Sequence, residues 1–351
     1  MSSSPTQSKP SRRVTLHDIA RHAGVNVGTV SGVLRGKAKE RRISAEVVAR
    51  VQAVAADMDY APNLLVRSLH QGQTKILSFF NGFRSRDRRD YYMDALTASI
   101  EQAGGALGYN ILVQCDFTLS AHDTYKYING GNNDGLIFFK PLDNDPMLPY
   151  LRRSNLPIVL LNAVDEEGVL SSVTDDWRSG IEEIARQLLS HSHRRIAILT
   201  GADLVDARNR TSYLRELLAQ HGIGVPADWV LEVDGKDAAQ VDEAMRRLLA
   251  APQPPTALFC WHDYVGYRAL EACHKLGIDI PRQLSLVGYD GVRWPACTTH
   301  ILGSVAADLE AMGAAAVEAL VELIRGDAES PIQRLMPVHF KAGTTLARIN
   351  S

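Results

Sequence analysis

The first pattern of apolar and polar positions along the chain predicts a short helix beginning near residue 15. Ile19, Ala20 and Ala23 recur at helical spacing, so the segment has one apolar face. Thr15 is followed three residues later by Asp18, which is the spacing of a capping box at a helix start. The pattern therefore predicts an amphipathic helix that packs on something else through these three residues.

A second short helix is predicted directly after a tight turn. Gly24 permits the positive φ that a sharp helix exit requires, and Asn26 can cap the helix that follows. Two helices joined in this way form a helix-turn-helix unit, which places its second helix in the major groove of DNA. A helical hairpin in an ordinary core is the alternative for this pattern alone. The apolar face of the second helix consists of Val30, Val33 and Leu34.

A third amphipathic helix and a short apolar segment complete the N-terminal pattern. The helix spans residues 44–58, and the segment that follows reads YAPNLLVRSL over 60–69. Pro62 can open a short helix there, but so brief a helix is not stable by itself in water. The third helix carries its apolar stripe on Val47, Val51, Val54 and Met58.

From residue 75 onward, short apolar runs alternate with helical patterns. Such alternation favours parallel sheets covered by helices on both faces, and two successive sets predict two doubly wound α/β lobes. Ligands of open α/β sheets bind beyond the carboxyl ends of the strands, so a cleft between the lobes is the expected site. We place strands at 76–80, 111–115, 135–139, 157–161, 195–199, 229–233, 257–261 and 284–289, and helices at 93–106, 181–189, 210–221, 238–249 and 265–276.

Charge is divided unequally along the chain. Residues 1–72 hold eleven Lys and Arg against five Asp and Glu, a net charge of +6, whereas the whole chain of 351 residues has a net charge of −2. A basic head on an acidic body is typical of a phosphate-binding module attached to a part that does not bind nucleic acid. The polar, basic start of the chain does not resemble a secretory signal, and no run of 18 apolar residues predicts a membrane span.

Other candidate chemistry is sparse. The four cysteines show no C-x-x-C spacing, which favours a reduced cytoplasmic setting. His191 and His193 could suggest a metal site, but their neighbours Arg194 and Arg195 favour a solvated loop. The sequence contains no G-x-S-x-G, no P-loop and no dinucleotide fingerprint after a strand. We therefore expect no enzyme activity, no cofactor and no metal.

These elements resemble the lactose/galactose repressor family of bacterial transcription regulators. The head matches in VTLHDIARHAGV, TVSGVL and APNLLVRSL, and the body in DGLIFF, HRRIAILTG, PTALFCWHD, ALEACHKLGIDIPRQLSLVGYD and VHFKAGTT, together from residue 14 to about 345. The resemblance implies a helix-turn-helix head, a hinge helix and two lobes similar to periplasmic sugar-binding proteins. The expected boundaries are a disordered tail at 1–13, the head at 14–60, the hinge at 61–73, the first lobe at 74–174 and 305–330, and the second at 175–304 and 331–351.

The resemblance also assigns residues to DNA. The base-contacting positions of the family fall on Val27, Gly28 and Gly32, and two glycines offer no side chain to base edges. We therefore expect thin direct readout through Val27 and Thr29, with specificity resting on the hinge, where Leu69 matches the family's minor-groove wedge. The loop over 37–42 is about three residues longer than that of the lac repressor and is basic. The remaining DNA-contact candidates are Thr15, Arg21, Asn26, Ser31, Arg35, Asn63, Arg67 and Ser68.

Effector candidates fall at expected strand ends. Arg210 matches the family's effector-binding arginine, at the opening of a helix, and Asp290 matches its acidic cleft residue. His262 stands where the family commonly carries Asn, with Asp263 beside it as a helix cap. Lys140 and the basic stretch at 83–90 could suit an anionic effector, or the stretch could be a solvated loop. The other candidates are Tyr91, Tyr92, Trp261 and Trp294, which could stack on a sugar, and Asp176, which could instead cap a helix.

The sequence thus predicts a cytoplasmic, homodimeric transcription regulator, most simply a repressor, that binds a pseudo-palindromic operator. A sugar or sugar derivative between the lobes would control it. A binding protein for transport fits the body alone, but the basic head and the start of the chain argue against that alternative. A regulator controlled by a partner protein is a further alternative.

Overall fold

The computed structural model describes residues 13–62, 68, 72–82, 90–114, 119–141, 144–201, 204–294, 299–329 and 331–349. The chain divides into two compact units, Met1–Thr74 and Lys75–Ser351. Of the expected hinge, Asn63, Arg67 and Leu69 lie outside the described residues. Ser68 is described and half-buried, and its carbonyl accepts from the Gly72 N–H at 2.8 Å.

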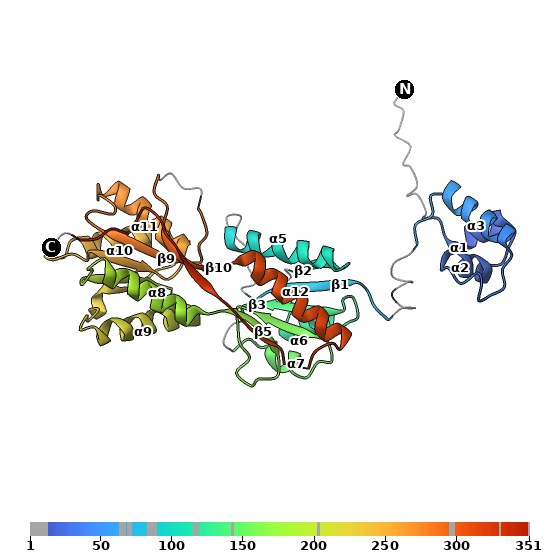
Figure 1. The fold of residues 1–351 in the computed structure, drawn as a ribbon, viewed down its shortest axis with the longest axis horizontal. Coiled ribbons are helices and arrows are strands. Elements are labelled where there is room, and N and C mark those ends of the chain that lie inside the picture. The colour runs from blue at the N-terminus through green and yellow to red at the C-terminus, as the bar shows by residue number, and fades with distance from the viewer. Residues whose placement is uncertain are drawn as a thin grey trace, which may run out of the picture. The chain divides into compact units, whose positions relative to one another are not determined.

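In the described part of the first unit, three helices form one domain (Figure 1), as the apolar pattern predicted. Its helices are α1 (Leu16–Ala23), α2 (Val27–Leu34) and α3 (Ala45–Asp57). Ile19, Val30 and Val51 contribute one side chain from each helix to a common core and have no exposed surface. Three short helices of this kind are stable because they share that core, since none is long enough to persist alone.

The helix ends of this unit are fixed by the expected caps. The Thr15 hydroxyl accepts from the Asp18 N–H, and the Asp18 carboxylate accepts from the Thr15 N–H at 3.0 Å, which completes the capping box. Gly24 ends α1 with a φ of +64°. Asn26 then caps α2, because its side-chain oxygen accepts from the Thr29 N–H at 2.7 Å. Gly24 and Asn26 therefore fix the turn between the two helices, and the capping box fixes where α1 begins.

The second unit consists of two α/β lobes, each built on a six-stranded sheet (Figure 1). The first sheet has the order β11-β5-β4-β3-β1-β2, and every strand pair in it is parallel. The elements of this lobe are β1 (Ile76–Asn81), α5 (Tyr91–Ala106), β2 (Asn110–Gln114), α6 (Ala121–Ile128), β3 (Gly135–Phe139), α7 (Leu148–Leu151), β4 (Ile158–Leu161), β5 (Ser171–Asp175), α12 (Leu309–Arg325) and β11 (Gln333–Met336).

The second lobe repeats this plan. Its sheet has the order β12-β10-β9-β8-β6-β7, and the pair β10–β12 is antiparallel while the others are parallel. Its elements are α8 (Trp177–Ser190), β6 (Ile196–Thr200), α9 (Val205–Gln220), a 3₁₀ turn at Ala227–Trp229, β7 (Val230–Glu232), α10 (Ala238–Leu249), β8 (Ala257–Cys260), α11 (Asp263–Lys275), β9 (Ser285–Tyr289), β10 (Gly303–Ala307) and β12 (Val338–Lys341). The predicted doubly wound architecture is confirmed.

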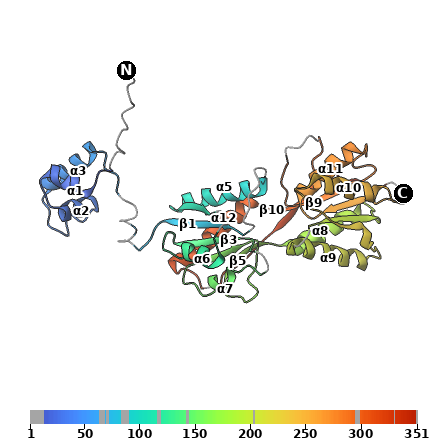
Figure 2. The same cartoon turned by 180° about the vertical axis from the view of Figure 1, so that it is seen from behind.

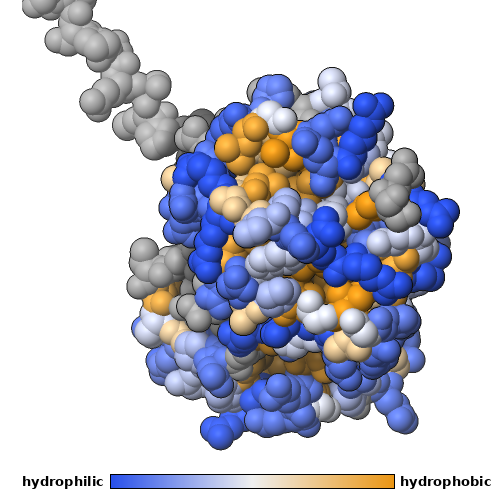
Figure 3. Space-filling model, turned by 90° about the vertical axis from the view of Figure 1, so that its left-hand side faces the viewer, coloured by the Kyte–Doolittle hydropathy of each residue, from blue (hydrophilic) through white to orange (hydrophobic). Residues whose placement is uncertain are grey.

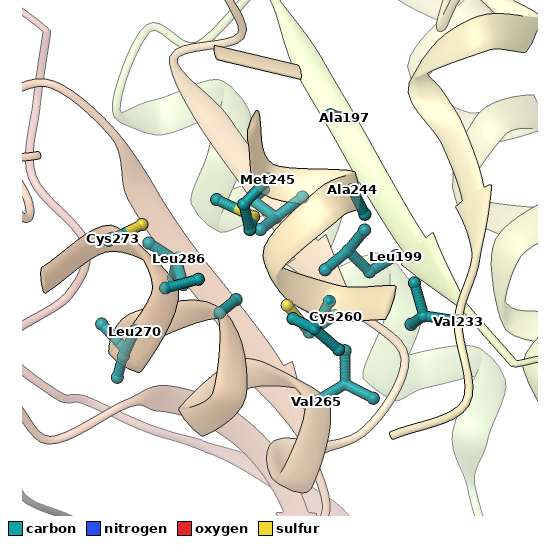
Figure 4. Packing of buried hydrophobic residues seen from close by; sticks show 14 of the residues in the cluster. Ala197, Leu199, Val233, Ala244, Met245, Cys260, Val265, Leu270, Cys273 and Leu286 are labelled. Carbon is teal, nitrogen blue, oxygen red and sulfur yellow. The ribbon is translucent and has the colours of Figure 1, made fainter. Parts of the chain in front are cut away.

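Successive strand residues point to opposite sides of a sheet, and helices cover both sides, so each sheet is buried on both faces. In β8, Leu258 and Cys260 join a core with α10 and α11, whereas Phe259 joins a second core with α8 and α9. Figure 4 shows side chains from these helices and strands, Met245 and Leu286 among them, meeting in the first of these cores. In the first lobe, α5 and α12 cover one face of the sheet, and α6 and α7 cover the other.

The chain passes between the lobes three times. It crosses after β5, again between β10 and α12, and finally at Pro337, between β11 and β12. Figures 1 and 2 show the last crossing as a nearly continuous C-terminal strand. The expected boundary after residue 330 is therefore wrong, because β11 pairs with β5 in the first sheet. The boundary at 305 is displaced as well, since β10 lies wholly in the second sheet.

The strands that pattern analysis missed are those at the crossings. Strands β5, β10, β11 and β12 were not predicted, because they lack the continuous apolar run of the central strands. The face of the protein in Figure 3 is mainly hydrophilic, with smaller apolar areas between the polar side chains. No helix among the described residues has the length and apolar character that crossing a membrane requires.

The stability of the second lobe can be tested at Leu286, which has no exposed surface. Leu286→Ala removes core contacts of β9 and should lower the free energy of unfolding by about 2–5 kcal/mol. Urea denaturation followed by tryptophan fluorescence measures this, because Trp177, Trp229, Trp261 and Trp294 all lie in this lobe. The control Leu276→Ala, at a site 38% exposed, should cost less than about 1 kcal/mol. Equal losses in the two variants would contradict the described core.

Candidate effector cavity and DNA-binding face

A cavity of about 490 Å³ lies between the two lobes, at the carboxyl ends of the central strands. Strand β3 and helix α5 contribute residues from the first lobe, and the segments after β6, β8 and β9 contribute from the second. This is where open α/β sheets place a ligand. Eight of the nine effector candidates line it together: Tyr91, Tyr92, Lys140, Arg210, Trp261, His262, Asp290 and Trp294.

Arg210 is a buried residue of the cavity wall, with 5% of its surface exposed. It lies in the second turn of α9, not at its opening, because the helix begins at Val205. Its Nη1 donates to the carbonyl of Trp261 at 3.0 Å. Its guanidinium lies 3.5 Å from a carboxylate oxygen of Asp290 and 3.7 Å from one of Asp175, and it stacks on the Tyr289 ring at 3.6 Å.

These contacts decide the charge of each group. Burial acts to lower the pKa of Arg210, but Tyr289, Asp290 and Asp175 raise it above its ordinary value, so the guanidinium stays charged. Burial raises the pKa of Asp290 to about 7, against the opposing effect of Arg210 and Lys140. The cavity therefore contains a carboxyl group that exchanges a proton near neutral pH.

Lys140 follows β3 and forms an ion pair with Asp206 of α9, so this pair joins the first lobe to the second. Burial acts to raise the pKa of Asp206, but the charges of Lys140 and Arg210 bring it below its ordinary value. The lysine charge is thus compensated within the protein. Because of this pairing, the interpretation of Lys140 as a reader of anionic effectors loses its main support.

His262 and Asp263 exchange the roles that the sequence suggested. His262 caps α11, since its Nδ1 accepts from the Val265 N–H at 3.1 Å, whereas Asp263 is the first helical residue. Burial lowers the pKa of His262 to about 4, so the ring is neutral at pH 7. Asp263 is buried and accepts from the Ser304 hydroxyl at 2.6 Å and the Val292 N–H at 2.7 Å. It therefore fixes the backbone beside the cavity, where a cap had been expected.

Aromatic rings form much of the cavity wall. The Trp294 ring packs edge to face on Tyr91 of the first lobe at 4.9 Å and on Tyr264 of the second at 4.5 Å. Trp261 packs closely over Gly201, where an added Cβ would lie 3.0 Å from the indole ring. The wall is thus partly flat and apolar, which suits the face of a sugar ring or a nucleobase.

Asp176 does not line the cavity, and its neighbour Asp175 is the acidic residue that faces Arg210. Asp176 caps α8, because it accepts from the Ser179 N–H at 3.2 Å. Asp175 ends β5 and accepts from the Tyr289 hydroxyl at 2.6 Å. Neither Asp175 nor Asp176 is among the residues that line the cavity, and helix capping, the alternative for Asp176, is what the structure shows. Trp177 also lies away from the cavity and packs on Tyr213.

The two loop histidines do not form a metal site. His193 is 1% exposed, and its ring contacts the Thr256 hydroxyl and the Ala347 carbonyl, so the expectation of a solvated loop is wrong at this residue. Burial lowers its pKa to about 4. Among the described residues, no group of three or more His, Cys, Asp and Glu is placed to hold a metal ion.

The candidate DNA-binding face lies on the first unit. Arg21, Asn26, Gly28 and Arg35 are exposed, and the candidates Thr15, Val27, Thr29 and Ser31 are half-buried. The side chains of Thr15 and Asn26 are engaged in helix caps. The sequence predicted only that the loop at 37–42 is basic. In the structure, Arg41 of this loop contacts α2, and its Nη1 donates to the Gly28 carbonyl at 2.9 Å.

Both units match known families. Residues 15–63 match the helix-turn-helix of bacterial regulatory proteins of the lacI family, and residues 185–346 match a periplasmic binding protein-like domain. A probable HTH-type transcriptional repressor ExuR of Bacillus subtilis is 26% identical over 89% of the chain and 92% of its own length. The ribose operon repressor of Escherichia coli is 26% identical over 88% of the chain and 93% of its own.

Solved structures agree on the fold. A lac repressor dimer bound to operator and the anti-inducer ONPF superimposes with a TM-score of 0.81, at 24% identity, over 96% of this chain and all of that one. The regulator CelR in complex with cellobiose gives a TM-score of 0.68 over 95% of this chain and all of that one, also at 24% identity. The chain therefore carries a helix-turn-helix of the lacI family and a periplasmic binding protein-like domain, and its relatives are named as transcriptional repressors.

The raised pKa of Asp290 gives the cavity a testable pH dependence. Near pH 4 the Asp290 carboxyl is largely neutral in the folded chain. Near pH 7 it is fully ionised in the unfolded chain but only partly ionised in the folded chain. The stability that Asp290 contributes is therefore lost as pH rises from about 4 to about 7. Asp290→Asn cannot ionise, so the wild type should lose up to about 4 kcal/mol relative to this variant over that range. A difference between the two proteins that does not vary with pH, in urea denaturation, would contradict the assignment.

Proposed function

We propose that the protein is a repressor whose dimer binds a pseudo-palindromic operator and whose DNA affinity is set by a small effector in the cavity between the lobes. The observation that supports the effector site is that eight of the predicted effector residues line one cavity. Relatives of the chain are named as repressors, and a lac repressor in the same fold binds operator as a dimer. Two-fold symmetry of the protein would be mirrored in two operator half-sites.

The effector that fits this cavity best is neutral and rich in hydroxyl groups. Of the cationic side chains that line the cavity, the buried Arg210 and the half-buried Lys140 are already paired with Asp206, Asp175 and Asp290, and Lys236 is exposed. An added phosphate or carboxylate would meet these carboxylates, and like charges at close range are unfavourable in a low-dielectric site. Hydroxyl groups, in contrast, can donate to a carboxylate and accept from a guanidinium.

Unsatisfied polar atoms beside the cavity favour the same class of ligand. Among the described residues, the Nε–H of Arg210, the indole N–H of Trp261 and Oδ1 of Asn162 are buried without a hydrogen-bond partner. Each such atom costs about 1–3 kcal/mol. A ligand that presents several hydroxyls along an apolar ring would contact the aromatic wall and bring partners to these atoms once the side chains adjust.

Contacts between the lobes would transmit the effector signal. Lys140–Asp206 and Tyr91–Trp294 each join one lobe to the other at the cavity rim. An effector that replaced either contact would change the relative stability of open and closed arrangements of the lobes. The hinge segments of a dimer would then change their spacing and so the free energy of DNA binding. Because it would act on the chromosome, we place the protein in the cytoplasm, with no catalytic activity of its own.

The effector class can be tested by thermal unfolding of the full-length chain, since a ligand that binds the folded state raises the melting temperature. We expect a rise with at least one neutral probe from D-ribose, D-glucose, cellobiose and adenosine, and none with glucose 6-phosphate or glucuronate.

Trp294→Ala should remove the shift by opening the aromatic wall, and Arg210→Ala should remove it as well. Arg178→Ala is the matched control, because Arg178 lies on Trp177 outside the cavity. A shift that survived in both cavity variants would mean that the ligand binds elsewhere. A response to the anionic probes alone would overturn the neutral class.

DNA binding can be tested by selection from random duplexes with the full-length chain at low salt. We expect enrichment of a sequence with two inverted half-sites, bound by one dimer, with an affinity that falls steeply as salt rises because phosphate contacts release counterions. Analytical ultracentrifugation of the complex gives the stoichiometry. Enrichment of a single asymmetric half-site, or of no sequence, would contradict a dimeric operator-binding repressor.

A further inference from the structure

The second helix of the DNA-binding unit carries two glycines on one face, and a side chain from a later loop covers one of them, Gly32. Gly28 and Gly32 lie four residues apart on α2 and therefore share a face. Gly32 is buried, and a Cβ added there would lie 2.9 Å from Cδ of Arg41 and 3.2 Å from Cδ1 of Ile43. The Arg41 side chain thus occupies the space that a side chain at position 32 would fill, whereas Gly28 is exposed and a Cβ there would meet only Oδ1 of Asn26, at 3.1 Å.

The guanidinium of Arg41 is held at the beginning of this helix. Its Nη1 donates to the carbonyl of Gly28 at 2.9 Å, and Gly28 is the second residue of α2. A guanidinium carries five N–H donors in a rigid fork, and this bond uses one of them. Arg41 is an exposed residue, so its fork is held against the helix and still reaches solvent.

The loop that carries Arg41 has an ordered backbone. Lys37 donates its N–H to the Gly32 carbonyl at 2.9 Å, and Arg41 donates its N–H to the Lys37 carbonyl at 3.1 Å. Arg42 turns the chain with a φ of +53°, and Ile43 closes the loop by donating to the Ala38 carbonyl at 3.0 Å. This arrangement fixes where the Arg41 side chain leaves the backbone, which is what a residue that selects one base requires.

We propose that Arg41 is the residue that reads a base edge in place of the side chains that Gly28 and Gly32 lack. The N-terminal part of the second helix of a helix-turn-helix is the part that contacts bases, and Arg41 places its guanidinium there. Guanine presents the two acceptors, O6 and N7, that an arginine fork contacts together in the major groove. The inference deepens the proposed DNA-binding function and rests on it.

Gly32 leaves the room that the Arg41 side chain needs, because that side chain passes over this glycine. Gly32→Ala adds a methyl group 2.9 Å from Cδ of Arg41, at a flexible side chain that can move aside. The helix itself should not suffer, since alanine has the higher helix propensity. The variant should therefore stay folded and lose sequence discrimination, which separates a reading role from a structural one.

The test compares Arg41→Ala with Arg42→Ala in the full-length chain, on the duplex that wild-type protein enriches and on a scrambled duplex. Both variants lose one positive charge from the same loop, so both should bind the scrambled duplex equally less well. Arg41→Ala should in addition lower affinity for the enriched duplex by about 5- to 150-fold, the range of one bidentate base contact. Arg41→Lys should keep affinity for scrambled DNA and lose the discrimination, and circular dichroism should show native helix content for Gly32→Ala.

A modified base identifies the partner. Each enriched guanine is replaced in turn by 7-deazaguanine, which lacks N7. With the wild-type protein, this replacement at one position in each half-site should weaken binding. With Arg41→Ala, the same replacement should cause no further loss of affinity. If Arg41→Ala and Arg42→Ala lower specific binding by the same factor, or if the 7-deazaguanine loss persists undiminished in Arg41→Ala, the inference is overturned. A wild-type protein that enriches no sequence would overturn the proposed function and, with it, this inference. If the wild-type protein enriches a sequence but Arg41→Ala and Arg42→Ala lower specific binding by the same factor, only the Arg41 inference is overturned.

Discussion

The organisation of the effector domain depends on one buried guanidinium. Arg210 cannot lose its proton in a protein, so it requires acceptors wherever it is buried. Here Asp175 arrives at the end of β5, Asp290 follows β9, and the Trp261 carbonyl follows β8. The carboxyl ends of β8 and β9 lie at one edge of the second sheet, whereas β5 belongs to the first sheet, so Arg210 is paired with groups from both lobes. Because several elements pair with this one charge, the positions of their strand ends are linked to one another and to the cavity wall, and an effector bound there would act on both lobes.

The same principle explains why a two-lobed body can switch. Lys140 pairs with Asp206 and Tyr91 packs on Trp294 across the lobes, while three chain crossings connect the lobes covalently. Polar and aromatic contacts at the rim can be exchanged for contacts to a ligand with little change in the apolar cores, which lie on both faces of each sheet. The lobes can therefore move as rigid bodies, and a modest difference in ligand affinity between two arrangements is enough to bias them.

Much of this was predictable from sequence because period and caps are local properties. Thr15 and Asn26 cap the two helices with their side chains, and Gly24 ends the first helix with a positive φ, so neighbouring residues alone specify the helix-turn-helix. Apolar runs such as that of β8 identify the central strands. The failures come from tertiary context. Strands β10, β11 and β12 lie next to the chain crossings and are defined by the strands they pair with in each sheet, which are distant in sequence for β11 and β12. Asp175 differs from Asp176 by one position at a strand end, and Arg41 reaches α2 through the path of an enlarged loop. Spacing along the chain contains none of this information.

Ligand binding in the cavity and DNA binding by the helix-turn-helix should be thermodynamically coupled. The most direct test of this coupling is the dissociation constant of the enriched duplex, measured by fluorescence anisotropy with and without a saturating concentration of the stabilising ligand. The account predicts a change of about 5-fold or more, and by linkage the duplex must change the ligand's dissociation constant by the same factor. Identical duplex affinities in the presence and absence of a ligand that demonstrably fills the cavity would contradict it.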